Sequence, residues 1–140
     1  MQSIRWNKKH EVFLPELDAE HRDIFRVAEE LRAAVAGGQR ERIRSLLDNL
    51  EAEVEGHLRH EERLMREMQY PSIEWHKQQH NAARKRLRSY SKQVAAGDAQ
   101  AAEAMLETLA SWLRDHTATA DRMMTAFVRN RRLQKSASAS

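Results

Sequence analysis

The segment VEGHLRHEERLMREMQYPSIEWHKQQH, residues 54–80, carries four of the seven histidines of this 140-residue chain. Within it His57 and Glu61 are four residues apart, and so are His76 and His80. Residues four apart lie on one face of an α-helix, one turn from each other. Helical bundles build metal sites in their cores from such pairs on neighbouring helices. The segment therefore predicts two helices that face each other across a metal-binding core.

The composition predicts an all-α protein. Two prolines and four glycines are few, helix-forming residues dominate, and no stretch alternates apolar and polar residues as a strand would. We expect an up-down-up-down antiparallel four-helix bundle formed by a single domain over residues 1–135. An extended N-terminal arm would cover residues 1–17, where Pro15 discourages helix, and residues 136–140 would form a disordered tail.

Apolar residues at helical spacing predict where the helices lie. Asp18 is a suitable N-cap for the first helix, and the breaks between helices fall at Gly37-Gly38, Tyr70-Pro71 and Gly97. The expected helices cover residues 18–36, 40–68, 72–96 and 99–129.

Polar residues interrupt the four apolar stripes, and in an antiparallel bundle they would all lie at one level. They are His21, His57, Glu61, His76, His80, His116 and Asp121. Asp121 follows His116 by five residues, which on an ideal helix turns it about 140° away. A π-bulge between them would bring both to the core. Glu62 and Arg59, which flank the second stripe, are expected to point elsewhere.

A metal is the best explanation of this set. A single core histidine is more often a hydrogen-bonded packing residue, and we expect His10 and His60 not to be ligands. Five histidines and two carboxylates that converge without a cation would instead destabilise the core. The chain has no cysteine, so the donors are imidazole and carboxylate, which suit Fe, Mn or Zn.

Several partner classes are not expected. The N-terminus has no apolar signal region, and no apolar run is long enough to span a membrane. We therefore expect a cytoplasmic protein that has no membrane partner. The net charge is +3, and basic runs occur at residues 84–88 and 129–132. On helices rich in acidic residues such runs are more often solvated faces than nucleic-acid sites, so no nucleic-acid partner is expected.

The chain resembles the bacterial hemerythrins over nearly its full length. The pieces that carry the resemblance are Trp6, Asp18-Ala19-Glu20-His21, His57-Leu58-Arg59-His60-Glu61-Glu62 with Leu64-Met65, Tyr70-Pro71, His76-Lys77-Gln78-Gln79-His80, and Trp112-Leu113-Arg114-Asp115-His116 with Asp121. The resemblance implies two Fe ions in an oxo- or hydroxo-bridged non-haem centre. His76, His80 and His116 would bind one iron, His21 and His57 the other, and Glu61 and Asp121 would bridge them.

The resemblance also implies a pocket for O2 beside the iron with two histidines, lined by Leu58, Trp112, Leu113 and Thr117. Relatives often have Phe at the position of Leu58, Ile at that of Thr117 and an aromatic residue at that of Met124. A smaller, more polar pocket would admit water. We therefore predict faster autoxidation of the oxygenated protein than in relatives with Ile at that position.

The leading function is reversible O2 binding for storage, delivery or sensing, rather than catalysis. The alternative is a di-iron oxidase or peroxidase that consumes O2 or peroxide. A signalling module or an iron reservoir is a third class. The ligands alone do not separate these functions, but a histidine-rich set leaves little room for an extra substrate.

Overall fold

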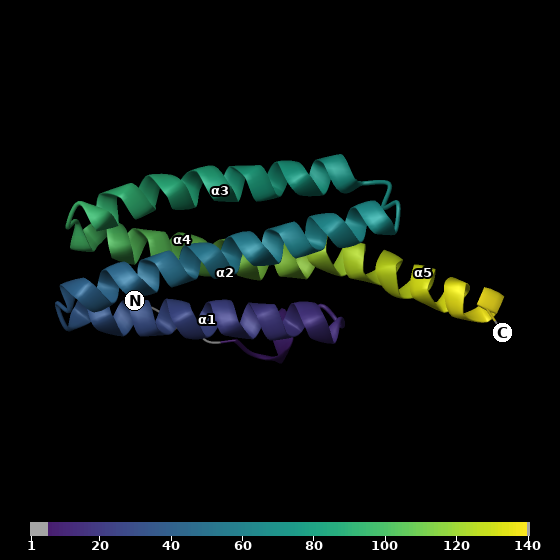
Figure 1. The fold of residues 1–140 in the computed structure, drawn as a ribbon, viewed down its shortest axis with the longest axis horizontal. Helices are drawn as coiled ribbons and strands as arrows, with labels where there is room; N and C mark the ends of the chain where they lie inside the picture. The colour runs from purple at the N-terminus through teal and green to yellow at the C-terminus, as the bar shows by residue number, and fades with distance from the viewer. Residues whose placement is uncertain (1–5, 140) are drawn as a thin grey trace.

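The computed structural model describes residues 6–139 and forms a four-helix bundle, as the sequence predicts (Figure 1). Four long rods run antiparallel, and the first rod packs against both the second and the fourth. The rods are α1 (Pro15–Ala36), α2 (Arg40–Glu67), α3 (Ile73–Ala95) and a fourth made of α4 (Ala99–His116), a π-helical turn (Thr117–Asp121) and α5 (Arg122–Ala139). The breaks fall where glycine and proline predict them, and Gly38 ends the first rod with a φ of 62°.

The N-terminal arm differs from the prediction. Residues 1–5 lie outside the described residues, a short 3-10 helix covers Lys8–His10, and α1 begins at Pro15 rather than near Asp18. Proline is favourable at the first position of a helix, because that position needs no N–H donor. Asp18 therefore does not cap the helix. Its carboxylate accepts a hydrogen bond from the backbone N–H of Val12 at 2.9 Å and fastens the arm to α1.

At the C-terminus α5 continues as helix through residues 136–139, and Ser140 lies outside the described residues. Two arginines of α5 hold the start of this extension against α1 and the end of α2. Arg131 Nε donates to the Met68 carbonyl at 3.3 Å, and Arg132 pairs with Glu16 at 2.8 Å. Residues beyond them have good helix propensity and no helix breaker, so α5 extends past the other rods (Figure 1).

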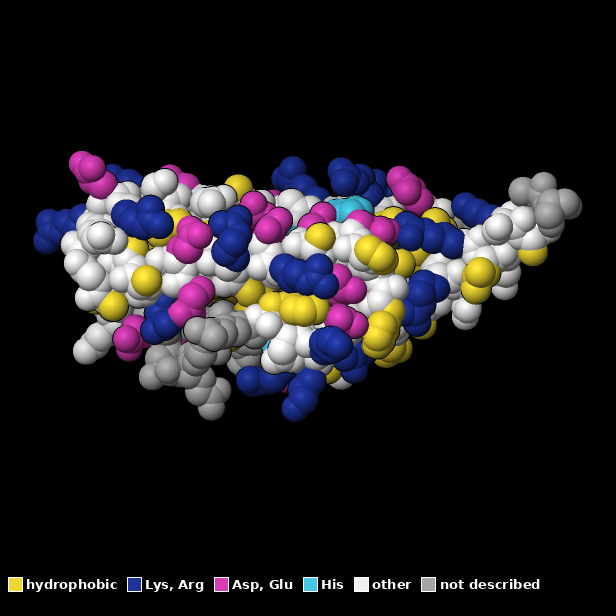
Figure 2. Space-filling model, turned by 90° about the horizontal axis from the view of Figure 1, so that it is seen from below, with side chains coloured by type: hydrophobic (Ala, Val, Ile, Leu, Met, Phe, Trp, Pro, Cys, Tyr) yellow, Lys and Arg dark blue, Asp and Glu magenta, His cyan; other side chains and the backbone are white. Residues whose placement is uncertain are grey.

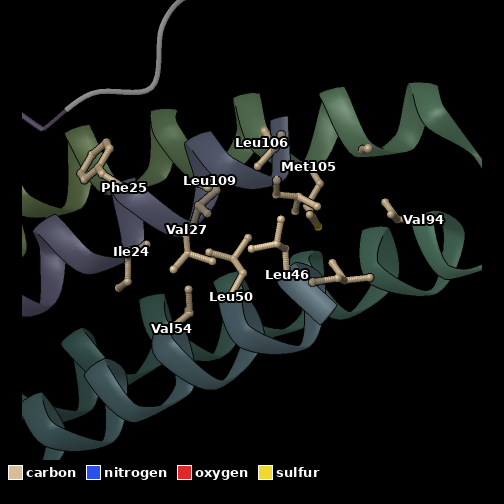
Figure 3. Close-up of a cluster of buried hydrophobic side chains, with 14 of the residues drawn as sticks. Ile24, Phe25, Val27, Leu46, Leu50, Val54, Val94, Met105, Leu106 and Leu109 are labelled. Atoms are coloured by element: carbon tan, nitrogen blue, oxygen red, sulfur yellow. The ribbon is translucent and has the colours of Figure 1, made fainter. Parts of the chain in front are cut away.

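One half of the bundle interior is entirely apolar. Leucines, isoleucine, valines and methionine from all four rods point into the space between the helices (Figure 3). Leu31 on α1, Leu50 on α2 and Leu106 on α4 are buried members of this cluster, which we call the apolar half. Its residues follow the three- and four-residue steps of the sequence, so hydrophobic burial accounts for the arrangement of the rods.

The surface carries charged side chains of both signs along most of its length (Figure 2). Several arginines of the two basic runs have specific acceptors, including Arg84, Arg131 and Arg132. Within residues 6–139 no helix combines the length and the apolar character needed to cross a bilayer.

Candidate metal centre

The seven polar residues of the stripes meet at one level of the bundle, which we call the polar half. Beyond this level a second buried apolar cluster, which includes Leu17, Leu64 and Met124, closes the bundle. α1 supplies His21, α2 supplies His57 and Glu61, and α3 supplies His76 and His80 from its first two turns. The fourth rod supplies His116 and Asp121. All seven side chains are at most 3 % exposed. The antiparallel order therefore brings residues from across the sequence into one water-excluded cluster, as expected.

Their donor atoms form two groups that share both carboxylates. One group contains Glu61, His76, His80, His116 and Asp121, and the other contains His21, His57, Glu61 and Asp121. Within each group the donor atoms all lie within 4.8 Å of one another. Two ions in these groups would be neighbours joined by two carboxylates.

Glu61 faces one group with each of its oxygens. Its Oε1 lies 3.0 Å from the Nε2 atoms of both His76 and His80, while its Oε2 lies 3.0 Å from His57 Nε2. Glu61 therefore offers one oxygen to each donor group.

Asp121 is divided in the same way. Its Oδ1 lies 2.9 Å from His116 Nε2 and 3.2 Å from His76 Nε2, and its Oδ2 lies 3.5 Å from His21 Nε2. The fourth rod can supply both His116 and Asp121 because it is underwound between them. The π-helical turn Thr117–Asp121 brings the aspartate onto the face of the histidine, as the sequence predicts for a shared site.

The comparisons with known proteins agree with this geometry. The family model described as the hemerythrin HHE cation-binding domain matches residues 12–128. The chain belongs to the hemerythrin family. Its resemblance to that family, inferred from the motifs, is thereby confirmed.

Two relatives and one solved structure are similar to this hemerythrin domain. The bacteriohemerythrin of Aquifex aeolicus (strain VF5) is 29% identical over 120 residues, which cover 84% of this chain and 92% of that protein. The bacteriohemerythrin of Stenotrophomonas maltophilia (strain R551-3) is 27% identical over 116 residues, which cover 83% of this chain and 75% of that protein. A crystal structure of a leucine-to-phenylalanine mutant superimposes with a TM-score of 0.82 at 23% identity, over 91% of this chain and 98% of that chain, and supports the fold.

The polar half of this hemerythrin domain is built to hold cations. His76 Nε2 and His116 Nε2 lie only 3.1 Å apart, and both atoms face the carboxylates. Both ring nitrogens of His21 and both oxygens of Asp121 are buried without a partner in hydrogen-bonding geometry among the described residues. Buried polar atoms left in this way cost free energy unless a metal or proton compensates them. The imidazole and carboxylate donors of this cluster therefore fit a metal site.

The pKa values show the same demand for positive charge. Burial alone would lower the pKa of His57, but the carboxylates of Glu61 and Glu20 outweigh burial and raise it to about 10. Burial would also lower the pKa of His116, but Asp121 and Glu61 outweigh burial and raise this pKa to about 9. Burial and Glu61 would raise the pKa of Asp121, yet its histidine neighbours hold it below its ordinary range. Protons therefore occupy the metal-free site, and a metal must displace them.

Three of the histidines are oriented from their outer side. His57 Nδ1 donates to Glu20 at 2.8 Å, His80 Nδ1 donates to Glu62 at 2.8 Å, and His116 Nδ1 donates to the side-chain oxygen of Gln79 at 2.9 Å. A ring N–H directed outward keeps Nε2 directed into the site, where this nitrogen can bind a metal once its own proton is displaced.

The prediction that Glu62 points elsewhere is wrong, whereas Arg59 is exposed and pairs with Glu55. Glu62 lies at the edge of the stripe, where the rotation of α2 against α3 decides which way it faces. The supporting residues Glu20, Glu62 and Gln79 are next to ligand positions in the sequence, and that adjacency is the only sequence signal for them.

His60 lies outside both donor groups but reaches the site indirectly, because its Nδ1 lies 2.7 Å from Glu20 Oε2. His10 is outside both groups and accepts a hydrogen bond from the Asn7 backbone N–H at 3.0 Å.

The four residues predicted to line an O2 pocket divide into two kinds. Leu58, Leu113 and Thr117 are buried, as a pocket closed to water requires. Trp112 is half-buried and makes its ring contacts with the three-histidine group, stacking on His116 at a centroid distance of 4.3 Å and meeting His80 edge-on at 6.2 Å. The ring contacts of Trp112 are thus with histidines of the three-histidine group, and its part in an O2 pocket stays a prediction.

Proposed function

We propose that this hemerythrin domain holds two iron ions and binds O2 reversibly. His76, His80 and His116 would hold one ion, His21 and His57 the other, and Glu61 and Asp121 both. The observation that carries the proposal is the pair of donor groups with two shared carboxylates in one buried cluster. Two adjacent ferrous ions can together supply two electrons to one molecule of O2.

The two groups offer unequal numbers of donors, and this inequality supports a single O2 position. One group has three histidines beside the shared carboxylates, and the other has two. The second group therefore leaves more room for an outside ligand. Leu58 and Leu113, which are at most 2 % exposed, would exclude water from the interior, and exclusion of water protects a reversible complex from losing its oxygen as peroxide.

Three of the histidines, His57, His80 and His116, keep Nε2 turned inward through their outer hydrogen bonds to Glu20, Glu62 and Gln79. Because these orientations exist without a metal, the chain does not need to reorganise its rings when the ions bind. The relatives named bacteriohemerythrin support the proposal by their similarity over most of this chain.

An oxidase or peroxidase that consumes O2 or peroxide is the second candidate, and one observation favours it. A surface pocket of about 390 Å³ reaches the outer face of His116 and is lined by Trp112, Gln79 and Asp115 among others. A small reductant in this pocket would contact Trp112, which stacks directly on His116.

Metal analysis and optical spectroscopy of the full chain test the proposal. We expect two irons per chain and an absorption band that appears when O2 is added to the reduced protein and disappears when O2 is removed. Steady consumption of O2 with a reductant, without a stable oxygenated form, would instead favour the oxidase. A chain that binds no iron would contradict both functions.

A further inference from the structure

Arg84, which lies on α3, forms hydrogen bonds with two carboxylates of α2. Its Nη1 donates to Glu62 Oε2 at 2.9 Å, its Nη2 donates to Glu62 Oε1 at 3.3 Å, and its Nε donates to Glu55 Oε2 at 2.9 Å. The guanidinium thus donates two hydrogen bonds to the Glu62 carboxylate and a third to Glu55, which lies two turns away on α2. The side chains of Arg84 and Glu62 are only 17% and 13% exposed, so solvent screens this pair less than a surface ion pair.

The same oxygen of Glu62 also holds a histidine of the metal centre. His80 Nδ1 lies 2.8 Å from Glu62 Oε2, and His80 itself is fully buried. An ionised carboxylate can only accept hydrogen bonds, so the proton of the His80 ring sits on Nδ1. His80 Nε2 is therefore the nitrogen left to face a metal, and it lies 3.0 Å from the Glu61 carboxylate that both donor groups share.

We propose that Arg84 is a positioning residue for the three-histidine group. By fixing Glu62, it fixes the rotation and the tautomer of His80 before a metal arrives. The inference rests on the proposed function only in requiring that the two donor groups bind metal; it does not depend on O2.

Among residues 6–139, the other donor group has no such support from an arginine. Glu20, which holds His57, is itself held by His60 at 2.7 Å rather than by an arginine. An arginine keeps its charge at all ordinary pH values and offers a rigid fork of donors, whereas a histidine offers a single N–H. The support from Arg84 therefore makes the three-histidine group the better preorganised of the two.

Binding of Co²⁺ to the full metal-free chain tests the proposal, because Co²⁺ gives visible absorption in such sites without any O2 chemistry. The affinity of each of the two groups is measured by competition with a chelator in wild type, Arg84→Gln and Arg84→Lys. We expect Arg84→Gln to weaken one of the two binding phases by about 10- to 100-fold, as loss of a supporting residue does in other metal sites. Arg84→Lys, which keeps the charge but not the fork, should lie between wild type and Arg84→Gln, and it carries the test if Arg84→Gln does not fold.

Arg59→Gln is the matched control. Arg59 also donates to Glu55, at 2.9 Å, but it is exposed and makes no bond to Glu62. Its loss removes an arginine from the same helix pair without releasing His80, so both Co²⁺ affinities should stay within twofold of wild type.

Proton exchange separates positioning from simple cross-linking of α2 to α3. In the Co²⁺ protein, the ring N–H proton of His80 should give a shifted NMR signal, assigned by its change in Glu62→Gln. We expect this signal to exchange with water at least tenfold faster in Arg84→Gln, and to be unchanged in Arg59→Gln. If Arg84→Gln matches Arg59→Gln in both affinity and exchange, Arg84 only joins the helices and the proposal is overturned. If wild type binds no Co²⁺, the metal centre itself fails.

Discussion

The apolar half and the layer of polar residues beside it follow the same helical periodicity but bury opposite kinds of side chain. In the apolar half, residues such as Leu31 and Leu106 fill the space between the rods with hydrocarbon. In the polar half, five histidines and two carboxylates occupy the equivalent inward positions and are just as buried. Burial of the apolar half is favourable without any compensating partner. The polar half carries buried charge that must be compensated.

Under the proposed function, a metal would compensate this buried charge in the folded state of the polar half. Any ion that binds the native chain more tightly than the unfolded chain adds its binding free energy to stability. Metal removal should therefore affect the two halves unequally, and substitutions in each half should give distinguishable results.

The largest effect is expected for Glu61→Ala. Glu61 belongs to both donor groups, and its two oxygens face opposite sides. The variant should bind fewer than one tightly held metal per chain where wild type binds two, and metal should no longer raise its thermal midpoint. Elemental analysis after gel filtration and thermal unfolding with and without metal measure both quantities. Glu67→Ala, an exposed glutamate of the same helix, should behave as wild type.

Leu106→Ala is the counterpart in the apolar half. Loss of this buried side chain should lower the free energy of unfolding by about 2–5 kcal/mol, with or without metal, while two metals stay bound. If Leu106→Ala also lost its metal, or if Glu61→Ala kept both ions, the division into two independent halves would be wrong.

A smaller effect is expected from pH, and only in the metal-free protein. The pKa values of His57 and His116 are raised to about 10 and about 9, above the value of 6.5 for an unperturbed histidine. Their charged forms therefore stabilise the metal-free fold fully below pH 6.5, and this stabilisation is lost as the pH rises through 9 and 10. We expect the metal-free chain to lose about 1 kcal/mol or more between neutral pH and pH 10 in urea unfolding.

The metal-loaded chain is the control for that experiment. Its histidines would hold metal in place of protons, so its free energy of unfolding should change little over the same range. Equal slopes in the two forms would show that protons do not replace metal in the polar half.

Much of this comparison could be predicted from the sequence, because periodicity decides which residues face inward. The stripes place His21, His57 and His76 in the core, and the five-residue step to Asp121 predicts the π-helical turn that the fourth rod has. The assignment of these residues as metal ligands stays a prediction.

Periodicity does not decide what happens at the edges of a stripe. Glu62 was expected outside the site, and it supports His80 because α2 and α3 are rotated so that their flanks meet. The sequence predicts Asp18 as the cap of α1, but α1 begins earlier, at Pro15, and the Asp18 carboxylate accepts a hydrogen bond from a backbone N–H of the arm. Both depend on contacts between segments that are distant in sequence.

The smallest effect is expected for Thr117→Ile, which replaces the most polar of the buried residues predicted to line the O2 pocket. From the sequence alone, the threonine hydroxyl should admit water and speed autoxidation. In the structure, Thr117 Oγ1 donates to the Arg114 carbonyl at 3.2 Å, so its hydroxyl is already paired with the backbone. We therefore expect Thr117→Ile to lengthen the half-life of the oxygenated form by no more than about threefold, less than 1 kcal/mol in barrier height.

Thr117→Val, which removes the hydroxyl without adding volume, separates polarity from size. If valine and isoleucine both lengthen the half-life tenfold, the hydroxyl does act on water, and the polar half is less tightly closed than the apolar half.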